Sequence, residues 1–295
     1  MRVLVTGAGG FAGGHIARRL AAAGFDVIAA TRSSTVEPPA DPSAARRFKI
    51  ATLALENRAT LPRSIDAVVH AAATSPWAGI TVEQMIADNV IATRGLIQHA
   101  LEVQAKAFVL CSSVSVFGTI SAPVLTEAAP VVDPGTYGAT KLLAEQMLAD
   151  VGRELPSLAI RLPAVVGRGS KRNWPSECLR KLVAGEPLAF FNPNAPFNNV
   201  VHEMDLAALA MSALISPPRG CDMVLAAAGG CITVGEAVQL LAEASGSSSP
   251  VTSTAQPRHA FLIDASKAGR LHGFAPISVA ETLRRFVADD AGARS

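Results

Sequence analysis

The sequence is poor in several kinds of residue that mark particular protein classes. Aromatic residues make up 5% of the 295 positions, with a single tyrosine among them, and charged residues reach only 17%, against about 25% in an average soluble domain. The net charge of +2 is too small to indicate a nucleic-acid-binding surface. Hydrophobic residues at 49% exclude an intrinsically disordered chain. The chain is longer than the ~100–150 residues of a typical domain, so we expect two domains or one large α/β unit.

Cysteine is also scarce, and no stretch has the composition of a membrane span. The cysteines share no C-x-x-C spacing, so neither a zinc site nor a disulfide framework is predicted; they are Cys111, Cys178, Cys221 and Cys231. We expect small core residues in a reducing compartment. The apolar start is too short for a signal peptide, and Ser, Thr, Gly and Pro interrupt the longest uncharged run, Ala107 to Thr126. We therefore expect a cytoplasmic protein with no metal and no membrane partner.

Short apolar runs alternate with alanine-rich helical stretches through the first half of the chain. The runs are bounded by turn residues, as is typical of buried parallel strands; they are Arg2–Thr6, Asp26–Ala30, Arg47–Ile50, Ala67–His70, Ala107–Cys111 and Leu158–Leu162. Helices are predicted near residues 13–23, 81–103 and 137–151, and a capping-box spacing from Thr81 to Gln84 opens the second. This rhythm predicts an α/β fold of the Rossmann type, a doubly wound parallel sheet, over residues 1–165.

Beyond residue 165 the rhythm changes. Longer loops are expected at Gly167–Trp174 and Phe190–Asn199, and a Ser- and Pro-rich surface loop at Ser245–Pro257. Two capping-box spacings predict helix starts in the last quarter of the chain: Thr233 with Glu236, and Ser278 with Glu281. Residues 166–295 are therefore predicted to form a smaller, mixed substrate-binding lobe, with segments that return to the sheet.

A glycine-rich segment follows the first predicted strand directly. It reads as G-x-G-x-x-A through Gly7, Gly9 and Ala12, or as T-G-x-x-G-x-x-G through Gly7, Gly10 and Gly13. Glycines allow a sharp turn and a close approach of the backbone to a pyrophosphate, whose charge then lies at the N-terminus of the following helix. This position between strand and helix predicts dinucleotide binding; a merely tight turn is the alternative.

The second predicted strand indicates which dinucleotide binds. An acidic residue at its end would bind the adenosine ribose hydroxyls and select NAD. The strand instead leads into Ala30-Thr31-Arg32, and Asp26 lies at the other end. The planar guanidinium of Arg32 is suited to a 2′-phosphate. The sequence therefore predicts NADP as the preferred cofactor, with NAD as the second possibility; a solvated loop charge at Arg32 is the alternative.

The single tyrosine lies four residues before a lysine, in Tyr137-Gly138-Ala139-Thr140-Lys141. On a helix the two side chains are neighbours, and a nearby positive charge lowers the pKa of a phenol from its usual value of about 10. Such a phenol is a general acid/base suited to a hydroxyl or carbonyl group; a helix-surface pair is the alternative. Upstream, Ser112, Ser113 and Ser115 follow a strand at the end where ligands of such sheets bind.

Taken together, these motifs resemble the extended short-chain dehydrogenase/reductase family, which includes sugar-nucleotide epimerases and dehydratases. The matching segments follow the family's order: Thr6–Gly13, His70–Ala73, Asn89, Ser112–Gly118, Tyr137–Lys141, Arg161–Pro163 and Val201–Leu206. The resemblance implies that Ser113 helps to hold the reacting oxygen, with Ser112 and Ser115 as the alternatives. It also implies that Tyr137 is the acid/base, and that Lys141 lowers the tyrosine pKa and binds the nicotinamide ribose. The cofactor-binding residues predicted in all are Gly7, Gly10, Phe11, Ala12, Gly13, Arg32, Leu53 near adenine, Ala71, Ala72, Ala73, Asn89, Tyr137, Lys141 and Pro163.

Two departures from the family pattern bear on the substrate and the cofactor. Thr52 stands where many members carry an acid that contacts adenine. Sugar-nucleotide members often carry an arginine at the position of Asn198, where it binds the nucleotide diphosphate, so its loss weakens the case for a nucleotide-linked sugar. The loop with Arg168, Lys171 and Arg172 could bind an anion instead, with a solvated basic turn as the alternative.

A few polar and aromatic residues invite structural interpretations. His70 and His202 are interpreted as structural histidines, because no third metal ligand is suitably spaced. Asp205 is predicted to cap the helix that follows it. Trp174 is expected to form either a substrate wall or a packing contact within the lobe.

The expected activity is hydride transfer between C4 of a nicotinamide and a carbinol carbon of a sugar or sugar-acid-like substrate. A net dehydrogenase and an epimerase that retains its cofactor both fit, and the missing arginine at Asn198 favours the dehydrogenase. The alternatives are a nucleoside-diphosphate-sugar 4-epimerase with retained NAD and a non-catalytic NADP-binding regulatory protein. The intact set Ser113, Tyr137 and Lys141 argues against the latter. The resemblance also implies a homodimer through helices 81–103 and 137–151.

Overall fold

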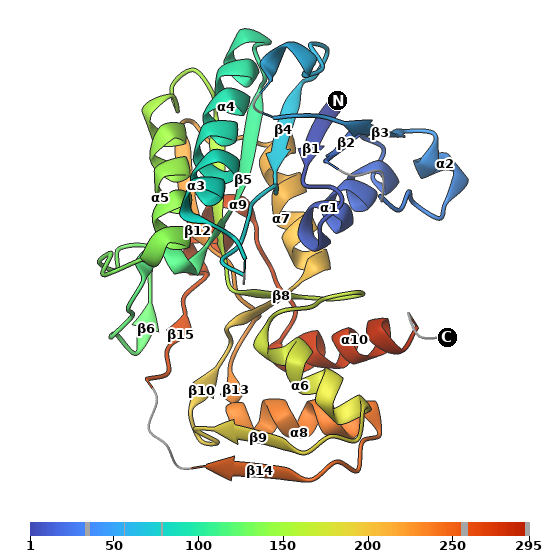
Figure 1. Cartoon of the computed structure of the whole chain (residues 1–295), viewed down its shortest axis with the longest axis vertical. Helices are drawn as coiled ribbons and strands as arrows, with labels where there is room; N and C mark the ends of the chain where they lie inside the picture. Colours follow the sequence, from blue (N-terminus) through green and yellow to red (C-terminus); the bar gives the residue numbers. More distant parts are fainter. Residues whose placement is uncertain (33–35, 56, 78, 255–258, 293–295) are drawn as a thin grey trace.

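A seven-stranded parallel sheet forms the upper part of the molecule (Figure 1). The computed structural model describes residues 1–32, 36–55, 57–77, 79–254 and 259–292. The strands of the sheet are β1 (Arg2–Thr6), β2 (Asp26–Thr31), β3 (Phe48–Thr52), β4 (Ala67–His70), β5 (Ala107–Ser113), β7 (Ser157–Leu162) and β12 (Cys221–Leu225). They lie in the order β12-β7-β5-β4-β1-β2-β3, and every pairing is parallel. The sheet grows outward from β1 in both directions, which is the doubly wound order, so the predicted fold class is confirmed.

Helices cover both faces of this sheet. One face is covered by α1 (Phe11–Ala22), α7 (Glu203–Ile215) and α9 (Ser266–His272), and the other by α4 (Ala92–Glu102) and α5 (Gly135–Asp150). Val3 and Val5 of β1 belong to the core under the first set, whereas Leu4 belongs to the core under the second. This division follows from the strand itself, because successive side chains point to opposite faces. We call the sheet with these helices the sheet unit.

The helix predicted over residues 81–103 is interrupted. It consists of α3 (Val82–Ile86), a π-helical turn η2 (Ala87–Ile91), and α4. Such wide turns occur often at functional sites, and this one contains the buried Asn89. Short elements complete the sheet unit: α2 (Pro42–Ala45), η1 (Arg58–Thr60) and η3 (Val114–Phe117).

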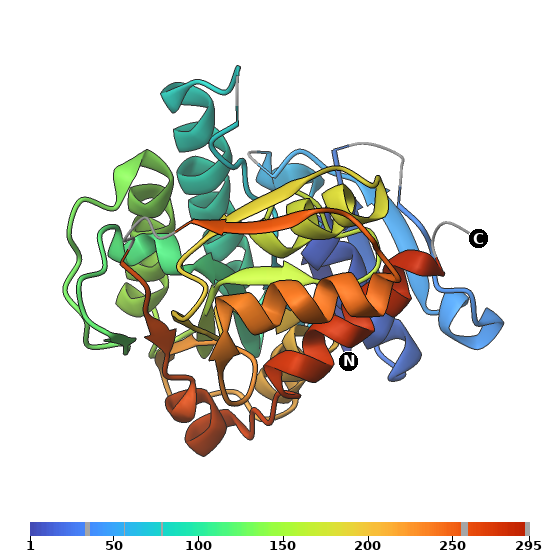
Figure 2. The ribbon, with the colours of Figure 1, turned by 90° about the horizontal axis from the view of Figure 1, so that it is seen from below.

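A lobe with its own core lies below the sheet unit (Figure 1). Its helices are α6 (Trp174–Val183), α8 (Val234–Ser245) and α10 (Val279–Ala291), and Figure 2 shows α8 and α10 side by side. Its strand pairs are β9 (Leu188–Phe191) with β14 (Val251–Thr254), and β10 (Pro196–Phe197) with β13 (Ile232–Thr233). Two further pairs are β8 (Ala164–Val166) with β11 (Val200–His202), and β6 (Val124–Leu125) with β15 (Leu262–Ile263). Strand β11 joins the two parts, because Val200 packs in the lobe core and Val201 in the sheet core.

The predicted strands and helices are present, with ends displaced by a few residues. Thr233 and Glu236 form both halves of the predicted capping box at α8. The prediction for Asp205 is wrong. His202 caps α7, accepting a hydrogen bond from the backbone N–H of Met204, whereas the Asp205 carboxylate accepts one from the backbone N–H of Ile277.

The predicted loops of the lobe contain more regular structure than expected. The first ends one residue early, because Asn173 caps α6 and Trp174 begins the helix. The loop predicted at Phe190–Asn199 contains β10, and the one at Ser245–Pro257 contains β14. Every residue of β14 is exposed, so the sequence carries no alternation that would mark it as a strand. The last part of that prediction, residues 255–257, lies outside the described residues.

The cysteines do not all behave as core residues. Cys111 and Cys178 are buried as predicted, but Cys221 is half-buried and Cys231 is exposed. Among the described helices, none combines the length and apolar character needed to cross a membrane.

Candidate functional site

The glycine-rich segment forms the turn between β1 and α1 and packs backbone against backbone. Gly7 has φ +71°, and a Cβ atom at this position would lie 2.5 Å from the backbone nitrogen of Ala72. A Cβ atom at Gly13 would lie 2.3 Å from the carbonyl oxygen of Gly7. Neither position can accept a larger residue without displacing the backbone. The turn therefore holds the N-terminus of α1 close to the end of β4, which is the arrangement that receives a pyrophosphate.

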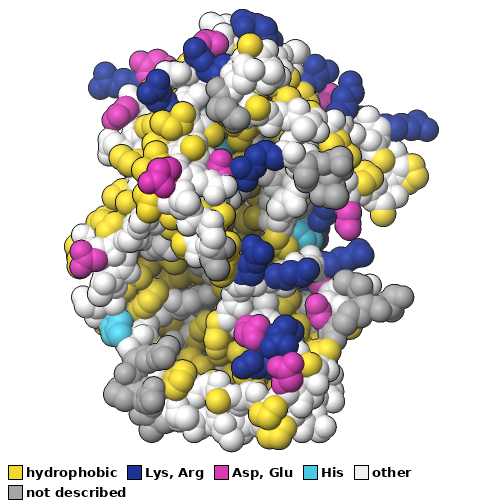
Figure 3. All heavy atoms as spheres, in the orientation of Figure 1, with side chains coloured by type: hydrophobic (Ala, Val, Ile, Leu, Met, Phe, Trp, Pro, Cys, Tyr) yellow, Lys and Arg dark blue, Asp and Glu magenta, His cyan; other side chains and the backbone are white. Residues whose placement is uncertain are grey.

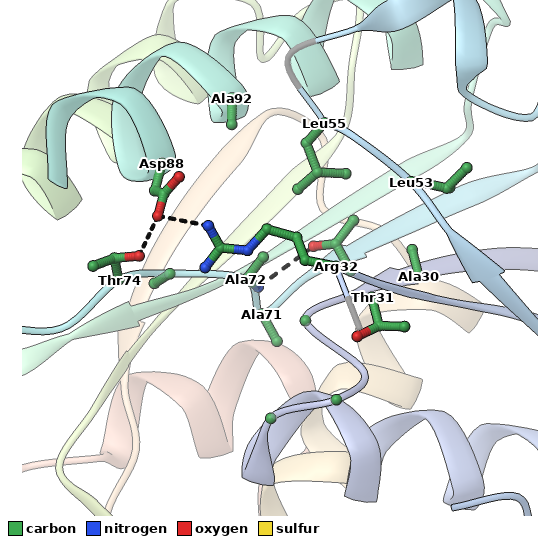
Figure 4. A pocket seen from close by; sticks show the side chains of 15 residues that line it. Ala30, Thr31, Arg32, Leu53, Leu55, Ala71, Ala72, Thr74, Asp88 and Ala92 are labelled. Carbon is green, nitrogen blue, oxygen red and sulfur yellow. Dashed lines mark hydrogen bonds and ion pairs between the residues drawn. The ribbon is translucent and has the colours of Figure 1, made fainter. Parts of the chain in front are cut away.

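A cavity of about 440 Å³ opens beside this turn, at the carboxyl ends of the central strands (Figure 4). We call it the glycine-loop cavity. The predicted cofactor residues that line it are Gly7, Gly10, Arg32, Leu53, Ala71, Ala72 and Ala73. Leu53, Leu55 and Ala92 supply apolar walls, while the glycines supply exposed backbone. Apolar walls suit an adenine ring and exposed backbone suits phosphates, so these residues fit the adenosine diphosphate half of a nicotinamide dinucleotide.

Arg32 does not stand free in this cavity. Its guanidinium Nη1 lies 2.9 Å from Oδ2 of Asp88, which lies in η2, and the hydroxyl of Thr74 donates to the same carboxylate oxygen (Figure 4). The sequence reasoning missed Thr74 and Asp88, although each adjoins a predicted cofactor residue: Thr74 follows Ala73, and Asp88 precedes Asn89. That adjacency was the one signal in the sequence that could have found them.

Asn89 lies behind the cavity wall rather than in it. Its amide oxygen accepts from the backbone N–H of Thr74 at 2.7 Å, and its amide nitrogen donates to the carbonyl of Thr74 at 2.9 Å and to the hydroxyl of Thr140 at 3.1 Å. The Thr140 hydroxyl in turn donates to the carbonyl of Tyr137 at 2.8 Å. Asn89 therefore ties the cavity wall to the first turn of α5, where Tyr137 lies.

Helix α5 brings Tyr137 against the serines at the end of β5. A Cβ atom at Gly138 would lie 2.1 Å from the carbonyl oxygen of Ser115, so the glycine permits a contact that no other residue allows. The Ser113 hydroxyl accepts from the backbone N–H of Ser115 and donates to the Ser115 hydroxyl, both at 3.1 Å. The Ser75 side chain forms a hydrogen bond with Tyr137. The structure thus gathers the predicted proton-transfer residues at one edge of the sheet, next to the glycine-loop cavity.

The pKa of Tyr137 shifts in the direction opposite to the sequence-based expectation. Burial raises the pKa of the Tyr137 phenol, with the hydrogen bond to Ser75 opposing the rise. Burial lowers the pKa of the Lys141 ammonium to about 8, although the charge of Glu145 favours the ammonium form. The pKa of the Tyr137 phenol is therefore raised rather than lowered as the sequence suggested, because desolvation of the buried phenol dominates.

A buried ion pair supports α5 from below. Arg161 of β7 donates to the carboxylate of Glu145, with Nη2 2.8 Å from Oε2, and its guanidinium lies 4.6 Å from the ring centroid of Phe117. The Ser112 hydroxyl donates to Oε1 of Glu145 at 2.5 Å. Ser112 is thus buried and bonded to Glu145, whereas Ser113 and Ser115 are half-buried.

The remaining predicted cofactor residues do not line the cavity. Phe11 and Ala12 are half-buried in the first turn of α1, where the Phe11 ring meets the edge of His15 at 4.9 Å. Pro163 is half-buried between β7 and β8. Gly13 packs under the turn as described above, so its glycine is required for the close contact rather than for space at the ligand.

The histidines predicted to be structural have structural contacts. His70 lies between the hydroxyls of Thr6 at 2.6 Å and Thr93 at 2.8 Å, and burial lowers its pKa to about 3. His202 lies 3.1 Å from Asp289 and close to Glu203.

Glu203 itself already has two side-chain partners. Its carboxylate pairs with Arg19 at 3.2 Å and His15 at 3.3 Å. Burial opposes its ionisation, but hydrogen bonds from His15 and Arg19 prevail and hold the pKa of Glu203 at about 2. His202, Glu203 and Asp289 thus all have side-chain partners at the contact between α1, α7 and α10.

Asn198, the basic loop and Trp174, for which the sequence indicated possible roles, have defined contacts. Asn198 is buried, and its amide makes two hydrogen bonds of 2.8 Å with the backbone of Ile263, one in each direction. Arg172 has φ +63°, and its guanidinium lies 5.1 Å from the ring centroid of Trp77. Trp174 packs edge-on against Phe197 at 5.2 Å. Figure 3 shows Lys and Arg side chains gathered at the hollow where the sheet unit meets the lobe.

Comparison with known proteins agrees with this geometry. The sequence matches the NAD dependent epimerase/dehydratase family over residues 3–225. It is 28% identical over 276 residues to UDP-glucose 4-epimerase from Azospirillum brasilense, covering 85% of this chain and 79% of that protein. It is 29% identical over 212 residues to D-erythronate dehydrogenase from Cupriavidus necator, covering 66% and 65%. The structure of MoeE5 in complex with UDP-glucose and NAD is similar, with a TM-score of 0.82 and 25% identity over 100% of both chains.

These comparisons also bear on the cofactor. The family is described as NAD dependent, and the MoeE5 structure contains NAD, so they do not support the NADP preference predicted from Arg32. The matched residues include the glycine turn, the serines after β5, and Tyr137 with Lys141. The predicted resemblance is confirmed: this chain is an enzyme that belongs to the NAD dependent epimerase/dehydratase family.

Proposed function

We propose that this enzyme moves a hydride between C4 of a nicotinamide and a carbinol carbon of a sugar or sugar acid, with Tyr137 as the general acid/base. The observation that carries the proposal is the gathering of Ser113, Tyr137 and Lys141 beside the glycine-loop cavity, where Gly138 lets α5 approach Ser115. A bound nicotinamide supplies the redox chemistry, and the protein supplies orientation and proton transfer.

The proposed roles follow from what each side chain can do. Tyr137 carries the proton that leaves or joins the substrate oxygen, and its raised pKa keeps it protonated at neutral pH until a positive charge enters the site. Oxidised nicotinamide brings such a charge. Ser113 donates a hydrogen bond to the same substrate oxygen, and Lys141 contributes a buried cation to the cofactor side of the tyrosine. Asn89 fixes the turn of α5 from behind.

The substrate proposal rests on Asn198 and the basic loop. The Asn198 amide is buried, makes hydrogen bonds in both directions with the backbone of Ile263, and carries no charge that would bind a nucleotide diphosphate. The Arg172 guanidinium lies over the ring of Trp77. Trp77 is two residues after Ser75, which is hydrogen-bonded to Tyr137, so Arg172 can offer a planar cation to a substrate carboxylate. We therefore favour a net dehydrogenase acting on a sugar acid, the substrate type named for the D-erythronate dehydrogenase relative. An epimerase that retains NAD is the second candidate.

The decisive experiment is the Tyr137→Phe variant. We expect it to bind the cofactor as the wild type does and to lose turnover by about 10²-fold or more, the usual contribution of general acid/base catalysis. Tyr137 is the single tyrosine of the chain, so no other phenol can take its place. Cofactor binding is measured by calorimetry. Turnover is measured with a panel of sugars, sugar acids and nucleotide sugars. Full activity in the variant would exclude the mechanism.

The same panel separates the two candidate reactions. A dehydrogenase changes the absorbance of reduced nicotinamide at about 340 nm when substrate is added, whereas an epimerase returns the hydride and leaves it unchanged. Titration with both dinucleotides tests the NADP preference that Arg32 suggests, and tighter binding of NAD would contradict it.

We also propose a homodimer through α5 and the interrupted helix formed by α3, η2 and α4, in a cytoplasmic enzyme. Large apolar side chains lie exposed on these elements, with exposed fractions of 47% at Val82, 43% at Ile86, 50% at Ile91 and 53% at Leu143. Exposed apolar patches of this kind mark protein interfaces. Light scattering of the purified protein is expected to give twice the mass of one chain, and the mass of a single chain would contradict the proposal.

A further inference from the structure

The ion pair between Arg32 and Asp88 crosses the glycine-loop cavity. Arg32 follows β2 on one side and Asp88 belongs to η2 on the other, 56 residues apart in the chain. Both residues line the cavity, and Figure 4 shows the Arg32 side chain extended toward Asp88 between the apolar walls. The group expected to recognise a 2′-phosphate thus already holds a carboxylate.

The strength of this pair is limited by water. The Arg32 side chain is 69% exposed and that of Asp88 is 25% exposed, and exposed pairs contribute little to stability. A phosphate dianion binds a guanidinium more strongly than one carboxylate does, because it carries more charge. A 2′-phosphate can therefore displace Asp88, whereas an uncharged ribose hydroxyl cannot.

Asp88 is also fixed from behind, so it cannot withdraw freely. The hydroxyl of Thr74 donates to the same Oδ2 atom that pairs with Arg32, and the backbone of Thr74 is held by the amide of the neighbouring Asn89. Once a 2′-phosphate has taken Arg32, the Asp88 carboxylate stays in the cavity and repels it. The carboxylate therefore opposes NADP both as a competitor for Arg32 and as a like charge.

From this arrangement we propose that Asp88 is a specificity-determining residue that restrains the affinity for NADP and lets the cavity accept NAD as well. The acid that selects NAD in related sheets follows the second strand, whereas Asp88 belongs to η2 and acts by disfavouring the 2′-phosphate. The inference rests on the proposed dinucleotide role of the cavity. It concerns the ratio of the two affinities, so it holds whichever dinucleotide the wild type binds more tightly.

The test is Asp88→Asn, which removes the charge while leaving an oxygen that can accept from Thr74. We expect the dissociation constant for NADP to fall by about fivefold, the effect of one exposed charge pair, and that for NAD to change by less than about twofold. Both are measured by calorimetry at fixed ionic strength, and thermal unfolding checks that the variant is folded. Asp88→Ser removes the same charge with a different side chain and must shift the ratio in the same direction.

Two matched variants identify the cause. In an Arg32→Gln background the substitution of Asp88 should change the ratio less than it does in the wild type, because the competition for the guanidinium is gone and only the repulsion between like charges remains. Thr74→Val, which removes the hydrogen bond but keeps the charge, should shift the ratio towards NADP by less than Asp88→Asn does, because the carboxylate remains but can withdraw more freely. An unchanged ratio in Asp88→Asn, or an equal shift without Arg32, overturns the inference. Failure of the wild type to bind either dinucleotide would instead overturn the proposed function.

Discussion

The sheet unit buries several charged side chains, whereas the charged side chains of the lobe lie at its surface. Among the described residues, the buried lysine, arginine and glutamates are Lys141, Glu145, Arg161 and Glu203, and all lie on strands or helices of the sheet unit. In the lobe, Arg180 pairs with Glu177 and Glu186 at 2.9 Å on the exposed face of α6. Buried charges require fixed partners, whereas exposed ones are screened and replaceable. The sheet unit therefore holds its buried charged groups in one geometry, while the exposed charges of the lobe can be replaced at little cost.

The largest expected difference concerns the ion pair under α5. Glu145→Gln leaves the guanidinium of Arg161 buried without a counter-charge, and breaking a buried pair in this way costs about 3–5 kcal/mol. We expect the free energy of unfolding, measured by urea denaturation, to fall by that amount. The Ser112 hydroxyl loses a charged acceptor at the same time.

The matched control lies in the lobe. Glu177→Gln removes one partner of Arg180 on α6, where both side chains are about half exposed and Glu186 remains as a second partner. We expect no measurable change in the free energy of unfolding. Equal losses in the two variants would show that the two regions do not differ as their burial indicates.

The sequence predicted those parts of the site that depend on local spacing. The glycine turn, Tyr137 with Lys141, and the strands that end beside them are each encoded within a few residues, because turn geometry and helix periodicity act locally. Contacts between distant segments could not be predicted in this way. Arg32 meets Asp88 across 56 residues, and Asn198 meets Ile263 across 65.

Tertiary packing also reversed two local expectations. Asp205 has the type of side chain that caps a helix, but His202 takes that place because the chain enters α7 directly from β11. Tyr137 and Lys141 have the predicted spacing, yet their pKa values follow burial, a property that emerges only when α5 packs on the sheet. Single sequences carry residue types and spacing, and desolvation follows from the assembled layers.

The pH dependence of stability gives a smaller effect that tests the same contrast between buried and exposed charges. The folded-state pKa of Lys141 is lowered to about 8 from 10.5 by burial, so between these values the unfolded chain binds more protons than the folded one. Stability contributed at this position therefore rises with pH from about 8 to 10.5, by at most about 1.4 kcal/mol for each pH unit. Below pH 8 the folded protein contains the buried ammonium, so its desolvation lowers the free energy of unfolding by the full amount.

Lys141→Met removes this dependence. We expect the difference in unfolding free energy between wild type and variant to shift in favour of the wild type as the pH is raised from 7 to 10, a range of about three pH units around the two pKa values, measured by urea denaturation without cofactor. Lys49→Met serves as the control, because Lys49 is exposed on β3 and gains no desolvation cost on folding. The same pH dependence in both variants would show that burial of the Lys141 ammonium does not lower its pKa. The contrast between buried and exposed charges would then fail at a residue of the proposed proton-transfer site.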